Sequence, residues 1–251
     1  MVFVRCVAGF LGPCLAVGGR ARAREGDAMK NGSAVVLLSG GFDSVAALCW
    51  AACRYPQIMA VSFLYGQPSA HQELSSARQA ADALNIRCDT LALADAVSGV
   101  QALGGYRSVV VPVRNLVFLA AAASYASKLW PDLGIDLIVG CNLDDDCEFF
   151  DCRRSFLAAV GRALCLGSDV SFRVVAPWID STKAEILEAS KANSNPVAWG
   201  LVARSWSCYY NEGPCGACGA CVKRAAAFAL EGERDLCVER APVGGDRARQ
   251  R

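Results

Sequence analysis

One short stretch of this 251-residue chain could bind a phosphate group, namely Ser39-Gly40-Gly41-Phe42-Asp43-Ser44. Its two glycines permit positive φ, so the chain can turn sharply between the apolar run 34–38 and a helix that opens at Asp43. Backbone N–H groups at such a helix start point at one spot, and the helix dipole adds partial positive charge there. The turn contains no lysine, which excludes the Walker loop.

A second stretch could bind a metal ion through Cys208, Cys215, Cys218 and Cys221, spaced Cys-x6-Cys-x2-Cys-x2-Cys. Four thiolates suit a closed tetrahedral zinc site, whose role is structural because no ligand position stays open. An iron–sulfur cluster is the alternative, but the ferredoxin run continues to Cys-Pro and residues 222–225 do not. We expect one structural Zn²⁺ per chain, tying residues 205–224 to the main domain.

The composition favours a globular, cytoplasmic protein. Hydrophobic residues make up 54% and charged residues 20%, and the net charge of +1 gives no sign of a nucleic-acid footprint. The other cysteines are scattered in apolar surroundings, as free thiols are in a reducing compartment. The first residues are expected to be a disordered extension or to follow a misplaced start codon, in preference to a targeting peptide. The expected units are 1–28 (extension), 29–200 (main domain, which contains the glycine turn), 201–232 (zinc segment) and 233–251 (tail).

Strand and helix patterns alternate along the chain. Apolar runs predict strands at 34–38, 58–65, 88–93, 136–140 and 172–176. Helices are predicted at 44–54, 72–84, 114–130, 155–166 and 182–192, the last opened by a Thr182/Glu185 capping box, with loops at 94–110 and 141–152. This alternation predicts an α/β, Rossmann-like fold: a parallel five-stranded sheet with helices on both faces. Ligands would then lie at the C-terminal ends of the strands. The apolar stretch of 114–130 is short for a membrane span and is predicted to be a core helix.

Several segments in order along the chain carry a resemblance to a known family. They are the glycine turn; Val111-Pro112-Val113-Arg114-Asn115 with Phe118-Leu119; Gly140-Cys141-Asn142, Asp145 and Asp151-Cys152-Arg153; residues 177–186; and Ser205-Trp206-Ser207-Cys208-Tyr209 with the later cysteines and Arg224. Together they resemble the 7-cyano-7-deazaguanine synthase (QueC) family of queuosine biosynthesis, within the PP-loop ATP pyrophosphatases. The resemblance covers roughly residues 33 to 232 and implies the adenine nucleotide alpha-hydrolase fold.

The resemblance implies an ATP-dependent ligase of a tRNA modification pathway. ATP would adenylate the carboxylate of 7-carboxy-7-deazaguanine, ammonia would displace AMP, and a second ATP would activate the amide oxygen, leaving a nitrile. The family also implies Mg²⁺ and a homodimer, with no membrane and no direct nucleic-acid partner. Three alternatives stay open: a QueC-like enzyme that adenylates a protein or another carboxylate in phage defence, sulfur insertion into tRNA, and a non-catalytic nucleotide-binding zinc module.

The family pattern also implies roles for individual residues. The ATP site would comprise Leu38, Ser39, Gly40, Gly41, Phe42, Asp43, Ser44, Arg114 and Asn115. Catalysis would rest on Ser39, Asp43 and Ser44, with Asp43 a candidate Mg²⁺ ligand and Lys183 neutralising phosphate charge. The deazaguanine would meet Tyr65, Gln67, Asn142, Asp145, Asp151 and Arg153. Trp206 is expected to be a core aromatic residue.

The chain departs from the family pattern at a few positions. The family usually reads Tyr-Gly-Gln-x-His, whereas this chain has Ser69 at that place and His71 two residues later. Asp146 stands where tyrosine is usual, Phe150 where proline is, and Gly219 where aspartate is. Most of these changes fall in the expected acceptor loops and spare the nucleotide turn, so ATP cleavage is better supported than the identity of the acceptor.

Overall fold

The computed structural model describes residues 32–93, 111–130, 134–145, 149–210 and 213–238. The expected extension (1–28), the expected loop 94–110, Asp146 and the tail beyond residue 238 lie outside the described residues. Among the described helices, none is long and apolar enough to cross a membrane.

Five parallel strands form one sheet in the order β3-β2-β1-β4-β5. Central β1 places Val35 beside Met59 on one neighbour and beside Leu137 on the other. Strand order reverses between β1 and β4, which is where open parallel sheets of this kind bind ligands. The strands are β1 (Ser33–Leu37), β2 (Gln57–Leu64), β3 (Cys88–Ala92), β4 (Ile135–Ile138) and β5 (Phe172–Val175).

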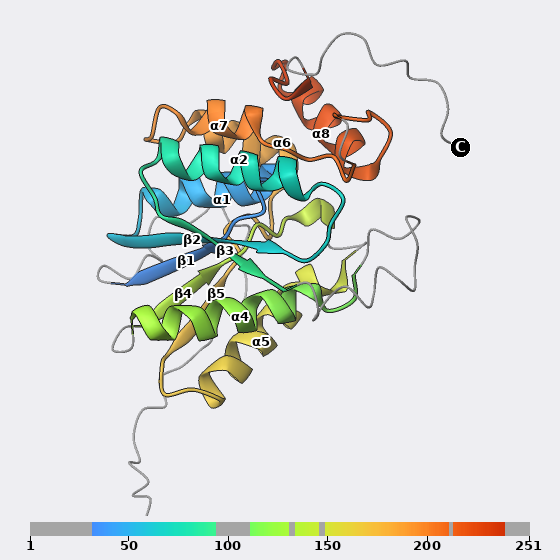
Figure 1. Cartoon of the computed structure of the whole chain (residues 1–251). Coiled ribbons are helices and arrows are strands. Elements are labelled where there is room, and N and C mark those ends of the chain that lie inside the picture. Colours follow the sequence, from blue (N-terminus) through green and yellow to red (C-terminus); the bar gives the residue numbers. More distant parts are fainter. Residues whose placement is uncertain (1–31, 94–110, 131–133, 146–148, 211–212, 239–251) are drawn as a thin grey trace, which may run out of the picture.

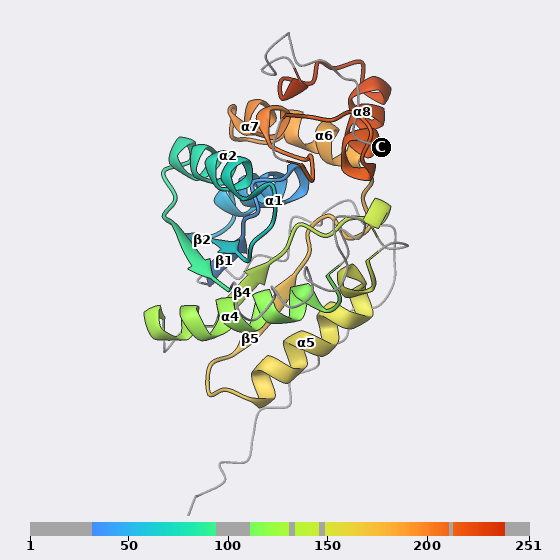
Figure 2. The same cartoon turned by 45° about the vertical axis from the view of Figure 1, so that its right-hand side comes forward.

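Helices cover both faces of the sheet (Figures 1 and 2). Successive residues of β1 face opposite sides, so Ala34 and Val36 pack into the core under one helical layer while Val35 and Leu37 pack into the other. The first layer comprises α1 (Phe42–Ala52), α2 (Ala70–Ala83), α6 (Lys183–Lys191) and α7 (Ala198–Arg204), and the second comprises α4 (Arg114–Leu129) and α5 (Arg154–Leu166).

The cysteine-rich segment ends in α8 (Gly219–Leu230), which packs beside α6 in the first layer (Figure 2). Phe228 of α8 packs into the core between the sheet and the first helical layer. Its ring contacts Phe42 of α1 edge to face, with ring centroids 6.1 Å apart. The segment is therefore attached to the helix that begins at the glycine turn.

The predicted α/β architecture is confirmed, and every predicted strand and helix is present with bounds shifted by at most two residues. The capping box at Thr182 and Glu185 is also present. Helices α7 and α8 were not predicted, because one is a seven-residue helix containing glycine and the other starts inside the cysteine motif. The predicted loop 141–152 holds two short 3-10 turns, Leu143–Asp145 and Phe150–Cys152.

Candidate active site

The glycine turn is held in shape by contacts on both sides. Gly40 has φ +77°, and a Cβ there would lie 2.2 Å from the carbonyl O of Glu73, so only glycine fits between the turn and α2. The Gly40 carbonyl accepts hydrogen bonds from Ser76 Oγ at 2.7 Å and Trp206 N at 2.9 Å. Gly41 is the N-cap of α1, so the first N–H groups of that helix face the turn. These contacts preorganise an anion site.

Two hydroxyl groups lie at the same turn. Ser39 Oγ and Ser44 Oγ are 3.0 Å apart, and Ser44 Oγ also donates to the Gly41 carbonyl at 3.0 Å. The Gly41 N–H donates to Ser39 Oγ at 3.3 Å. Both predicted serines therefore lie at the glycine turn and line its polar side.

Lys183, the first residue of α6, reaches across to the first turn of α1. Its Nζ donates to Oδ2 of Asp43 at 2.6 Å, and its side chain is 8% exposed. Burial by itself lowers the pKa of Lys183, but the carboxylates of Asp43 and Asp145 outweigh it and raise that pKa above its usual value. Lys183 therefore places a fixed, charged ammonium group beside the glycine turn, whose own sequence contains no lysine.

A second group of charges lies at the first 3-10 turn. Asp144 Oδ2 accepts the backbone N–H of Lys183 at 2.9 Å, and Asn142 Nδ2 donates to Asp145 Oδ2 at 2.9 Å. Lys223 of α8 lies 3.6 Å from Asp145 Oδ1. Burial raises the pKa of Asp145, with Lys183 opposing the shift and Asp43 adding to it. The end of β4, the start of α6 and the cysteine-rich segment therefore meet at one place.

These groups line a cavity of about 960 Å³, large enough for a nucleotide together with a second small molecule. The cavity brings together most of the predicted site residues: Leu38, Ser39, Gly41, Phe42, Asp43, Ser44, Tyr65, Gln67, Arg114, Asn115, Asp145 and Lys183. Gly40, Asn142, Asp151 and Arg153 are not among its lining residues in the described part of the chain.

Predicted substrate residues outside or at the edge of the cavity mostly support its walls. Gln67 accepts the Tyr65 N–H at 3.0 Å and donates to Glu73 at 3.1 Å, which shapes the loop after β2. Asp151 Oδ2 accepts the N–H of Asn115 at 2.9 Å in the first turn of α4, where a carboxylate complements the helix dipole. The Arg153 guanidinium packs 4.2 Å over the ring of Phe150.

Arg114 carries a half-buried positive charge on the α4 side of the cavity. Its NH1 donates to Tyr65 Oη at 3.3 Å, and the guanidinium lies 5.7 Å from the centre of the Phe118 ring. Burial lowers the pKa of Arg114, but neighbouring Tyr65 and Asp151 bring it above the usual value. Its Nε is buried without a hydrogen-bond partner among the described residues, so the charge is available to an anionic ligand.

Several residues that line the cavity were not predicted to belong to the site, including Glu73, Lys223, Trp206, Tyr209 and Cys141. Trp206, expected in the core, is half-buried on the cavity wall and donates through Nε1 to the Cys208 carbonyl at 2.7 Å. The only signal for Lys223 is its place two residues after a cysteine ligand, and nothing in the local pattern of α2 distinguishes Glu73.

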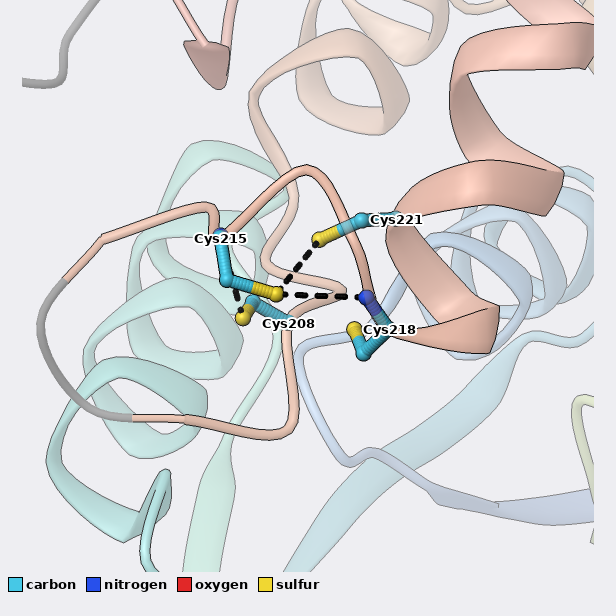
Figure 3. Close-up of side chains that lie close together, drawn as sticks. All are labelled: Cys208, Cys215, Cys218 and Cys221. Carbon is cyan, nitrogen blue, oxygen red and sulfur yellow. Dashed lines mark hydrogen bonds between the residues drawn. The ribbon is translucent and has the colours of Figure 1, made fainter. Parts of the chain in front are cut away.

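The four predicted metal-ligating cysteines converge, with their sulfur atoms within 4.8 Å of one another (Figure 3). A tetrahedral zinc–thiolate site with bonds of about 2.3 Å requires such a separation, so the residues fit the ion. Hydrogen bonding from the Cys221 thiol and the N–H groups of Cys215 and Tyr210 lowers the pKa of Cys208 to about 5. At least one thiolate is therefore available at neutral pH.

Arg224 fastens the cysteine-rich segment to the domain. It is 3% exposed, and it donates to both carboxylate oxygens of Asp235, at 2.7 and 2.8 Å. It also donates to Ser205 Oγ at 3.0 Å and to the Ala203 carbonyl at 2.8 Å, and its guanidinium lies 5.6 Å from the centre of the Phe42 ring. Arg224 therefore connects the cysteine-rich segment to the helix that begins at the glycine turn.

A divalent cation such as Mg²⁺ also fits the site. Asp43 Oδ1 is buried and has no hydrogen-bond partner among the described residues, while Oδ2 of the same carboxylate holds Lys183. A lone carboxylate oxygen beside a phosphate site is the usual protein contribution to Mg²⁺ bound with substrate phosphates.

Together, the parallel sheet, the glycine turn at its switch point and the buried lysine define a nucleotide-binding α/β enzyme of the PP-loop class. The family described as queuosine biosynthesis protein QueC matches residues 33–232. The chain belongs to this family.

Relatives of known name agree with this membership. The 7-cyano-7-deazaguanine synthase of Methanothermobacter thermautotrophicus is 35% identical over 223 residues, covering 80% of this chain and 96% of that protein. The protein of the same name from Laribacter hongkongensis is 33% identical, covering 82% and 94%. Among solved structures, NMN synthetase from Francisella tularensis is similar with a TM-score of 0.47 and 17% identity, over 81% of this chain and 79% of that chain.

Proposed function

We propose that this protein is an ATP-dependent 7-cyano-7-deazaguanine synthase. It adenylates the carboxylate of 7-carboxy-7-deazaguanine with release of pyrophosphate, and ammonia then displaces AMP to form the amide. A second ATP adenylates the amide oxygen, and loss of AMP and a proton leaves the nitrile. Carboxylate and amide oxygens are poor leaving groups, and transfer of the adenylyl group of ATP to them lets each depart as AMP.

The observation that supports this proposal best is the pairing of the glycine turn with a buried, charged lysine. Adenylyl transfer needs the polyphosphate held in place and its charge neutralised as pyrophosphate leaves. In our proposal the turn and the start of α1 hold the phosphates, and Lys183 stabilises the negative charge that develops on the leaving pyrophosphate. Mg²⁺, when bound through Asp43, would supply further charge neutralisation.

The acceptor would lie in the same cavity between Arg114, on the α4 side, and Asp145, which interacts electrostatically with Lys183 and Asp43. Arg114 carries the cation suited to a carboxylate, and Tyr65 holds its guanidinium in place. Asp145 is the predicted acceptor residue that lines the cavity with a carboxylate, a group that can accept hydrogen bonds from the amino and ring N–H groups of a deazaguanine. The other predicted residues would act indirectly. Asn142 would position Asp145, Asp151 would position Asn115, and Arg153 would support the adjoining turn.

The experiment is AMP release from ATP by purified protein with ammonium, with and without 7-carboxy-7-deazaguanine, followed by mass spectrometry of the products. AMP that depends on the acid, together with a nitrile product, is the expected result. AMP release without nitrile would overturn the proposed acceptor but would still support adenylyl transfer. No AMP release from folded, metal-loaded protein would overturn the proposed enzymatic activity.

A second candidate is adenylation of a different carboxylate by the same machinery. It is favoured by one observation: Pro68 and Ser69, which stand where the family pattern has its x-His, line the cavity. Ser69 Oγ donates to Glu73 Oε1 at 2.6 Å, so the altered residues are built into the wall. Screening small and protein-borne carboxylates for AMP release separates the two candidates.

We further propose structural zinc at the four cysteines from their spacing, a cytoplasmic location from the composition and scattered free thiols, and a homodimer from the family resemblance. The proposed units remain an ATP-binding domain at 29–200 and a zinc segment at 201–232. Metal analysis of the purified protein and its mass in solution by light scattering test the zinc and the dimer.

A further inference from the structure

Lys223 brings a cation from the cysteine-rich segment into the cavity. It lies two residues after Cys221 in α8, and it lines the same cavity as Asp43. Its Nζ donates to the backbone carbonyl of Asp144 at 2.8 Å and lies 3.6 Å from Asp145 Oδ1. A residue of the cysteine-rich segment thus contacts the turn that follows β4.

That turn is connected to the rest of the charged site. Asp144 Oδ2 accepts the backbone N–H of Lys183 at 2.9 Å, so its position affects the start of α6. The Asp145 side chain is 19% exposed and lines the cavity. A carboxylate at such a place repels a polyphosphate unless a cation balances it, because charges interact strongly where water is scarce.

We propose that Lys223 is a positioning residue of the ATP site. Its positive charge offsets the negative charge of Asp145, and its hydrogen bond fixes the Asp144 backbone. The carboxylate of Asp145 then does not repel the triphosphate. The inference rests on the proposed function in that its ligand is ATP. The cysteine-rich segment then has a second role besides stability, because the metal fixes the start of the helix that carries this lysine.

The test compares zinc-loaded full-length protein with Lys223→Met, Lys223→Arg and Lys191→Met. Lys191 is a matched control: its Nζ also joins α6 to the chain that follows α8, at 3.2 Å from both Glu231 and Glu233, and it does not line the cavity. The measurements are ATP affinity by calorimetry without acceptor, KM for ATP and kcat for AMP release, thermal stability and bound zinc.

Lys223→Met should weaken ATP binding and raise KM for ATP by roughly tenfold, the equivalent of losing one charged hydrogen bond. The fall in kcat should be smaller, and Lys223→Arg should restore most of the affinity. Lys191→Met should leave both ATP affinity and KM unchanged. Equal effects of the two methionine variants, or loss of zinc from Lys223→Met alone, would overturn the proposal in favour of a purely structural role.

A second background isolates the route through Asp145. In Asp145→Asn protein the negative charge is absent, so adding Lys223→Met should cost little further ATP affinity. The same loss in both backgrounds would mean that Lys223 acts without Asp145, and would refute the proposed mechanism. Wild-type protein that binds ATP and forms no nitrile overturns only the proposed acceptor, whereas wild-type protein that binds no ATP overturns both.

Discussion

Lys183 Nζ lies 2.6 Å from Oδ2 of Asp43, and the residues that it joins are 140 positions apart in the chain. The bond connects the first residue of α6 with the first turn of α1, next to the glycine turn. A PP-loop without lysine therefore acquires one from a distant helix.

Replacing Lys183 with methionine should lower kcat for AMP release by roughly 10²–10³, the usual cost of removing one group that stabilises transition-state charge. The variant should also be less stable, because Asp43 keeps its charge without its partner. The double variant Lys183→Met with Asp43→Asn should recover stability in chemical denaturation but not activity. A Lys183→Met enzyme with near-normal kcat would contradict this role.

Gly140 should not tolerate a side chain. A Cβ there would lie 2.6 Å from the N atom of Ser44 and 2.7 Å from the carbonyl carbon of Asp43, and these backbone atoms cannot rotate away. We expect Gly140→Ala to weaken ATP binding and to cost on the order of 1–3 kcal/mol of stability, as overpacking does. Gly167→Ala, at the end of α5 with 3.4 Å to the nearest atom, is the control and should leave ATP binding unchanged.

Val113→Gly should stabilise the protein. Val113 has φ +53°, the left-handed region that β-branched residues rarely adopt, and it immediately precedes α4. Removing the left-handed strain should stabilise the fold by about 1–2 kcal/mol, whereas the greater backbone entropy of glycine in the unfolded chain should cost about 0.5–1 kcal/mol. The difference predicts a rise in Tm of a few degrees. Val113→Ala keeps the positive φ and should gain less; an unchanged or lower Tm for Val113→Gly would contradict the assignment of strain.

Tyr55 should make stability depend on alkaline pH. Its hydroxyl donates to Oδ2 of buried Asp136 at 2.6 Å, and burial together with this bond raises the pKa of Tyr55. Above about pH 10 the tyrosine ionises in the unfolded chain but stays protonated in the fold, so the unfolded state holds fewer protons and stability falls as pH rises. Tyr55→Phe should lose about 0.5–1.5 kcal/mol at neutral pH.

Denaturant unfolding of wild type and Tyr55→Phe across the alkaline range measures this effect. The difference in free energy of unfolding between the two proteins should be constant up to about pH 10 and shrink above it. A difference that stays constant at higher pH would show that Tyr55 does not keep its proton in the fold.

Metal removal should affect both stability and the nucleotide site. Chelation, or Cys218→Ser, should lower Tm and weaken ATP binding, because a metal bound by the four cysteines would fix the segment that carries Arg224 and Lys223. Cys53→Ser, at an exposed thiol outside the cluster, should change neither. Elemental analysis should find one zinc per chain and the protein should be colourless; iron with visible absorption would show a cluster instead.

Local sequence was sufficient for most of the architecture. The alternation of apolar runs with helical patterns predicted the five strands, and the central strands β1 and β4 are buried along their whole length because their residues are mostly apolar. The glycine turn and the capping box were recognisable because their chemistry depends on neighbours within about four residues. The cysteine cluster was recognisable because the spacing Cys-x6-Cys-x2-Cys-x2-Cys is typical of a metal site.

Tertiary structure decided which distant side chains share the site. The strand order brings the ends of β1 and β4 together, and this adjacency places Lys183 against Asp43 and Asp144 against the start of α6. It also decided that Trp206 and Lys223 line the cavity, which no local period indicates. Charge pairs between segments far apart in the chain depend on packing geometry, and a single sequence carries no signal of that geometry until the layers are assembled.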